Sequence, residues 1–123
     1  MNGAIIASVV VAGSIGAVLR YLATRLVAAD HFPTPVLLVN AFGSLVAGVL
    51  LALSEAAMID PDLSLILLTG FCGGLTTFST LSVESIQLIR DDRTRVAIAS
   101  ITANVVLGIG AALTGYLVTY ALV

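Results

Sequence analysis

The chain alternates between long apolar runs and short polar segments. Four runs carry no charged side chain: residues 1–19, 31–54, 63–83 and 96–123. A helix needs about 20 apolar residues to cross the hydrocarbon core of a bilayer, and each run is close to that length or longer. The pattern therefore predicts four membrane-spanning helices joined by short turns. We place them at residues 4–26, 34–54, 63–89 and 97–121.

The composition agrees with this pattern. The chain has 123 residues, of which 59% are hydrophobic and 10% are charged, whereas soluble domains carry about 25% charged residues. Four spans leave no room for a separate soluble domain, so we expect one transmembrane domain over residues 1–123. The first span has no basic side chain before its apolar stretch, and we interpret it as an uncleaved helix rather than a signal peptide.

The third run differs from the other three because glycines and hydroxyl residues interrupt it. Gly70, Gly73 and Gly74 precede a hydroxyl cluster made of Thr76, Thr77, Ser79, Thr80 and Ser82. Non-helical or polar backbone at membrane depth is tolerated only where it is buried in protein or lines a watery path. A helix broken here would expose main-chain groups that can hold ions. We predict a broken third helix and an ion site at the break.

Small residues recur at spacings of four along the other spans. The sets are Ser8, Ala12 and Gly16; Gly13 and Ala17; Gly43 and Ala47; Ser44 and Gly48; and Gly108 and Ala112. Such stripes let membrane helices approach closely and pack. Because four helices make a small bundle with little interior, we expect the chain to form oligomers.

Two polar residues lie within or at the ends of the first two spans. Asn40 shares a helix face with Gly43, Ser44 and Ala47, and its amide is either an interhelical hydrogen-bonding group or a donor that lines a pore. Arg20 ends the first span, where it either extends to the lipid headgroups or faces a water-filled vestibule. The spacing alone leaves both pairs of alternatives open.

Three further residues follow the break in the third span. Phe78 and Leu81 are three positions apart and share a face. A phenyl ring is normally part of a core, but its positive edge can also face a small anion. Glu84 comes one turn after Thr80, where it pairs with an arginine, joins a polar network or lies at a pore mouth.

Catalytic and metal-cluster chemistry find no support in this sequence. The only histidine, His31, lies at a span end, no paired carboxylates share a helix face at mid-membrane, and Cys72 is the single cysteine. We therefore expect neither an enzyme nor a nucleic-acid partner.

Three motifs together resemble the CrcB/Fluc family of small fluoride channels. They are Gly13-x-x-Gly16-Ala17-x-x-Arg20-Tyr21, Val39-Asn40-x-x-Gly43-Ser44, and the run Gly70-Phe71-Cys72-Gly73-Gly74-Leu75-Thr76-Thr77-Phe78-Ser79-Thr80. The resemblance implies a dual-topology dimer of antiparallel four-helix subunits in the plasma or inner membrane, with two narrow pores that export toxic cytoplasmic fluoride.

The resemblance also implies roles for individual residues. Carbonyl oxygens of Gly73 and Thr76 would bind a structural sodium ion on the dimer axis. Asn40 and Phe78 would line a pore, and Arg20 would lie near its vestibule. Further positions on the polar side of the third helix would be Thr80, Ser82 and Glu84.

The chain departs from the family pattern at one position and leaves another part unassigned. A second phenylalanine usually follows the first by three residues, and here that position is Leu81, which lacks a ring edge. In the fourth span the family's pore hydroxyls cannot be matched to particular residues. The candidates are Ser100, Thr102, Asn104 and Thr114.

Two other functions and a second partner stay open at this point. A four-span drug/proton antiporter would need a carboxylate in the first span, and residues 1–19 contain none. The chain could also be a structural or partly degenerate subunit of a heterodimeric fluoride channel, and the presence of Leu81 in place of a phenylalanine fits that hypothesis. All five arginines lie in the first and third inter-span regions, which favours one orientation with both termini outside. An oppositely oriented paralogue is therefore an alternative to the antiparallel homodimer.

Overall fold

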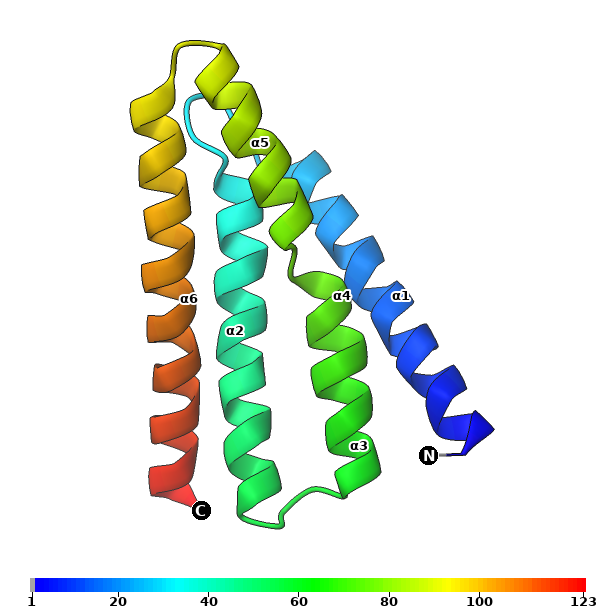
Figure 1. Cartoon of the computed structure of the whole chain (residues 1–123). Coiled ribbons are helices and arrows are strands. Elements are labelled where there is room, and N and C mark those ends of the chain that lie inside the picture. The colour runs from blue at the N-terminus through cyan, green and yellow to red at the C-terminus, as the bar shows by residue number, and fades with distance from the viewer. Residues whose placement is uncertain (1) are drawn as a thin grey trace.

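The computed structural model describes residues 2–123 and shows a bundle of long helices (Figure 1). The elements are α1 (Gly3–Leu26), α2 (Thr34–Glu55), α3 (Pro61–Leu65), the π-helical segment η1 (Ile66–Cys72), α4 (Gly73–Leu75), α5 (Phe78–Arg90) and α6 (Thr94–Leu122). The elements from α3 to α5 form one interrupted span, so four stretches are long and apolar enough to cross a membrane. The predicted four-span all-α architecture is confirmed, and the chain is a multi-pass membrane protein.

The helix starts follow from local sequence. The Asn2 side chain accepts a hydrogen bond from the Ile5 N–H at 3.0 Å and caps α1. Asp60 accepts from the Asp62 N–H at 2.9 Å, and Pro61 occupies the first position of α3. Both arrangements satisfy N–H groups that have no partner within a helix.

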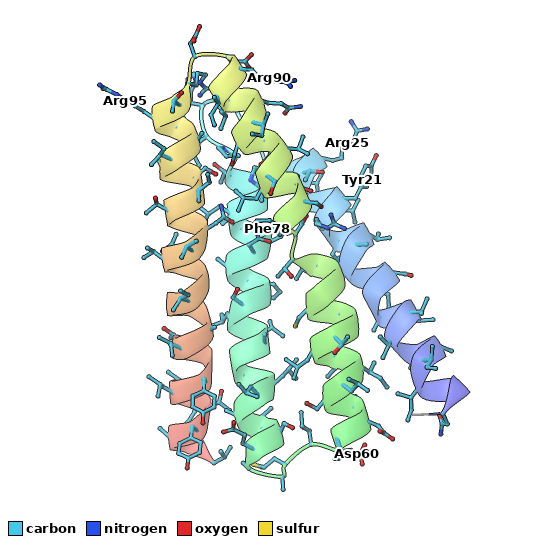
Figure 2. The ribbon with its side chains drawn as sticks, in the orientation of Figure 1. Tyr21, Arg25, Asp60, Phe78, Arg90 and Arg95 are labelled. Atoms are coloured by element: carbon cyan, nitrogen blue, oxygen red, sulfur yellow. The ribbon has the colours of Figure 1, made fainter. Side chains whose placement is uncertain are left out.

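The two ends of the bundle differ in charge. The chain termini and the turn between α2 and α3 lie at one end, whereas the other two turns lie at the opposite end (Figure 1). Arg25, Arg90 and Arg95 lie at the end that holds two turns, and Asp60 lies at the end that holds the termini (Figure 2).

Two close helix contacts hold the bundle together. In the contact between α2 and α6, a Cβ added to Gly48 would collide with the main chain of Ala112. In the contact between α1 and the first half of the third span, a Cβ on Gly16 would collide with the Phe71 carbonyl. Close backbone approach through small residues is how membrane helices gain packing contacts. The packing role predicted for Gly16 and Gly48 is confirmed.

Candidate ion site at the break in the third span

The third span is interrupted at Thr76 and Thr77, immediately after its glycines. Thr76 has φ −77° and ψ 155°, and Thr77 has φ −150° and ψ 122°, so both are extended. Gly73, by contrast, is helical with φ −63° and ψ −37°. The prediction of a broken helix in this segment is confirmed, and the residues that break it are the two threonines rather than the glycines.

The glycines of this span serve helix packing instead. A Cβ on Gly74 would collide with the main chain of Gly13, and one on Gly70 would lie 2.7 Å from the Val9 carbonyl oxygen. These positions let α1 lie directly against η1 and α4, because any side chain there would separate the two backbones. The glycines therefore fix the first half of the span, and the two threonines redirect the chain.

Asn40 of α2 is bound to the break by its amide. Its Oδ1 accepts the Thr77 N–H at 2.8 Å, and its Nδ2 donates to the Thr77 carbonyl at 3.1 Å. A second Nδ2 hydrogen bond, of 2.8 Å, goes to Oδ1 of Asn104 in α6. Asn40 thus satisfies main-chain groups that the break leaves without helical partners, and it is an interhelical group that also lines the site.

Asn104 is a site residue that the sequence could name but not place. Its side chain is 8% exposed, and its Nδ2 donates to the Ser100 carbonyl of the preceding turn at 2.9 Å. An amide in an otherwise apolar span was the available signal. Its register against Asn40 depends on how α2 and α6 cross, and the sequence alone does not fix that crossing.

The hydroxyl residues after the break cap α5. Thr77 Oγ1 accepts the Thr80 N–H at 3.1 Å and also donates to Thr80 Oγ1 at 3.1 Å. Ser79 Oγ lies 3.2 Å from the same Thr77 oxygen. A threonine cap satisfies one of the free N–H groups of a helix start, so this cluster begins α5 in the middle of the membrane.

The break opens onto a groove of about 330 Å³ between the third span, α2 and α6. Among its lining residues are Asn40, Thr76, Thr77, Phe78, Leu81 and Asn104. Phe78 and Leu81 behave differently there, because Phe78 is 82% exposed whereas Leu81 is only 7% exposed. Phe78 projects from the start of α5 (Figure 2), and Leu81 packs into the bundle.

The other predicted residues of the third span lie outside this groove. Ser82 donates to the Phe78 carbonyl at 2.9 Å and is not among the residues that line the groove. Glu84 lines a smaller cavity of about 170 Å³ at the arginine-rich end, together with His31 and Arg93. Thr80 is bonded to Thr77, as described above, and is not among the residues that line the groove.

Two buried polar atoms lack a hydrogen-bond partner within residues 2–123: Glu84 Oε2 and Ser100 Oγ. The hairpin of α5 and α6 turns at Asp92, and Glu84 and Ser100 each lie eight positions from that residue, one on either side. Equal rise along both helices places them at the same level. Polar side chains with free hydrogen-bonding atoms therefore follow Asn104 towards the arginine-rich end.

Arg20 contacts the first half of the third span. Its Nε donates to the Gly74 carbonyl at 3.2 Å, and the contact is partly buried. Arg20 therefore joins α1 to the C-terminal end of α4, where a positive charge is favourable beside unpaired carbonyl groups.

Main-chain oxygens at the break are available to a cation. Within residues 2–123, no hydrogen bond reaches the carbonyl oxygen of Gly73 or that of Thr76. The same residues contain no cluster of three or more His, Cys, Asp or Glu side chains that could hold a metal.

Comparisons with known proteins agree on one family. Residues 7–116 match the profile described as "CrcB-like protein, Camphor Resistance (CrcB)". A protein of Methanopyrus kandleri named "Fluoride-specific ion channel FluC" is 41% identical over 112 residues, which cover 89% of this chain and 85% of the relative. Its namesake in Pyrococcus horikoshii is 36% identical over 119 residues, covering 95% and 97%. "Fluoride-specific ion channel FluC 1" of Yersinia pseudotuberculosis is 42% identical over 101 residues, covering 80% of each chain.

Proposed function

The chain belongs to the CrcB-like family, and from that premise we propose that it is a passive, fluoride-selective channel. It would let cytoplasmic fluoride leave the cell across the plasma or inner membrane. The observation that carries the proposal is the groove at the break, where two amides and an exposed phenyl ring meet. None of the nine described residues that line this groove is acidic, so no carboxylate there would repel an anion.

The chemistry of the groove suits fluoride. Fluoride is the smallest halide and the strongest hydrogen-bond acceptor among them, so it needs strong donors in place of its hydration shell. Amide NH₂ groups are such donors, and the positive edge of a ring adds a weaker one. An inside-negative membrane potential drives an anion outward by about 2.3 kcal/mol per 100 mV. No coupling ion is then required.

A partner subunit would complete each pore. Phe78 is 82% exposed although it lines the groove, so this chain alone leaves its ring open to a partner. The partner we favour is a second copy in antiparallel orientation, so that two grooves form two pores within the lipid bilayer. Strong similarity to the family supports this choice over a different chain.

A structural sodium ion fits the main-chain oxygens at the break. The carbonyl groups of Gly73 and Thr76 accept no hydrogen bond within residues 2–123, and unwound main-chain carbonyls are the usual ligands of sodium in broken membrane helices. Two antiparallel copies would together supply four oxygens. When bound, the ion would offset the partial negative charge of these carbonyls. Thr76 and Thr77 hold the break open through their extended backbone.

The distribution of arginines supports an alternative partner. Arg25, Arg90 and Arg95 lie at one end of the bundle (Figure 2), and cytoplasmic loops are enriched in basic residues. A chain with this bias would insert in one orientation, with both termini outside, and would pair with an oppositely oriented paralogue. Reporter fusions at the C-terminus separate the two cases. Signals on both sides of the membrane support the homodimer, and a purely external signal supports the paralogue.

The experiment that tests the function measures fluoride efflux from liposomes containing the purified chain, with and without a pH gradient. A passive channel gives efflux at both settings, whereas a drug/proton antiporter requires the gradient. The antiporter is disfavoured because α1 (Gly3–Leu26) contains no carboxylate. Leu81, which is buried rather than exposed in the groove, favours the second candidate, a partly degenerate subunit. That reading predicts no efflux from the single chain.

A further inference from the structure

The amide of Asn40 has one N–H that is not bound to main chain. The Thr77 peptide groups take its Oδ1 and one Nδ2 hydrogen, at 2.8 Å and 3.1 Å. If the Asn40 amide were flipped, its oxygen would face the Thr77 carbonyl and its NH₂ group would face the Thr77 N–H, and neither pair can form a hydrogen bond. These two bonds therefore fix the amide's orientation. The remaining Nδ2 hydrogen is directed at Asn104 Oδ1, 2.8 Å away.

Asn104 is itself held in place by its own helix. Its Nδ2 donates to the Ser100 carbonyl at 2.9 Å, so its Oδ1 cannot turn away from Asn40 unless that bond is lost. Asn40 and Asn104 both line the groove at the break. The hydrogen bond between them therefore lies in the wall along which an anion would pass.

Two of the three hydroxyl groups that line the groove, those of Thr76 and Thr77, are already engaged. Thr76 Oγ1 donates to the Cys72 carbonyl at 2.9 Å, and Thr77 Oγ1 donates to Thr80. Leu81 contributes no donor. The Asn40 hydrogen that faces Asn104 can be given up without breaking a main-chain bond, so its hydrogen bond can be transferred to a passing anion.

We propose that Asn104 is a specificity-determining residue, because its amide oxygen holds the Asn40 hydrogen that a permeating anion must accept. An anion gains this donor only by displacing an amide carbonyl. Fluoride accepts hydrogen bonds more strongly than an amide oxygen, whereas the larger chloride accepts them more weakly. Asn104 thus competes with the anion for the Asn40 hydrogen, and only an anion that accepts hydrogen bonds more strongly than an amide oxygen can displace it. This inference rests on the proposed function.

The test compares Asn104→Leu and Asn104→Ala with the parent in liposomes, using the fluoride concentration that gives half-maximal efflux. Interhelical hydrogen bonds in membranes are worth about 0.6–1.7 kcal/mol. Removal of the competitor is therefore expected to lower the half-saturating concentration by roughly three- to twentyfold. The maximal rate should be kept, and chloride should begin to inhibit fluoride efflux. Ser14→Val is the matched control, since Ser14 of α1 bonds only to Val10 of its own helix, at 2.8 Å, and does not line the groove.

The outcomes separate this inference from the function it rests on. A parent chain that conducts no fluoride overturns the proposed function. A conducting parent whose two Asn104 variants keep or raise the half-saturating concentration overturns the inference and leaves the function standing. The alanine variant, which adds no bulk, reports on the bond if the leucine variant does not fold. A fall in maximal rate alone, with unchanged selectivity, assigns Asn104 a structural role and also overturns the inference.

Discussion

The two halves of the third span are held in place by different interactions: the first by close main-chain packing and the second by hydrogen bonds. The first half, from α3 to α4, packs its main chain against α1, so closely that a Cβ on Gly74 has no room. The second half, α5, begins at a threonine cap and is joined to its neighbours through the amide of Asn40. It leaves Phe78 exposed where the first half buries Leu75.

This difference separates scaffold from site within one span. Close glycine packing fixes the first half, because main chain against main chain allows little movement. Hydrogen bonds join the second half to the neighbouring helices, and a ligand that donates or accepts hydrogen bonds can replace one of the bonded groups. A change in the glycine half should therefore affect folding, whereas a change in the polar half should affect anion passage in a folded protein.

The largest effect is expected from Gly74→Val in the first half. The added side chain would meet the Gly13 main chain, which cannot move aside as a flexible side chain could, and overpacking costs about 1–3 kcal/mol or more. Little monodisperse protein should elute on size exclusion in detergent. Gly110→Val is the control, because nothing lies within 4 Å of a Cβ at Gly110. Equal behaviour of the two variants would contradict the packing account.

Asn40→Asp should remove anion passage without unfolding the chain. The carboxylate can still accept the Thr77 N–H, but it loses both Nδ2 hydrogen bonds and places a negative charge in the groove. Two unit charges 4 Å apart at an effective dielectric of 20 repel by about 4 kcal/mol, which corresponds to a loss of fluoride efflux of roughly a thousandfold. Size exclusion should give the parent profile. Efflux at the parent rate would show that Asn40 lies off the path.

Phe78→Ile should reduce fluoride efflux by roughly two- to tenfold, since ring contacts are worth roughly 0.5–1.5 kcal/mol. The substitution keeps an apolar side chain and removes the positive ring edge. Phe42→Ile is a matched control, because Phe42 is 54% exposed on α2 and does not line the groove. An equal decrease in both variants, or none in either, would make the pore assignment of Phe78 wrong.

The smallest effect is expected from Thr76→Ala. If carbonyl groups bind the sodium ion, this substitution keeps the ligand and removes only the bond from Thr76 Oγ1 to the Cys72 carbonyl. The free energy of unfolding should change by about 1 kcal/mol, and sodium should still raise the thermal stability of the variant. Loss of that sodium dependence would assign the binding to the side chain. A structure determined in sodium with no cation at the dimer axis would contradict the site altogether.

The four spans could be predicted from the sequence because hydrophobic length alone determines them. The position of the break could not, because a glycine that allows a turn and a glycine that allows close packing look the same in a sequence. Gly73 and Gly74 are helical, Gly74 serves packing, and the extended residues are Thr76 and Thr77. Asn104 was visible as a polar residue, but only the crossing of α2 and α6 brings it to Asn40.

The most direct test of the central claim, that the groove at the break conducts fluoride selectively, compares two anions in one preparation. Liposomes containing the purified chain are loaded with equal concentrations of fluoride and chloride, and efflux of each is followed under an imposed potential and no pH gradient. The account predicts rapid fluoride efflux with chloride retained at the level of protein-free liposomes. Equal efflux of the two anions, or efflux of neither, would contradict it.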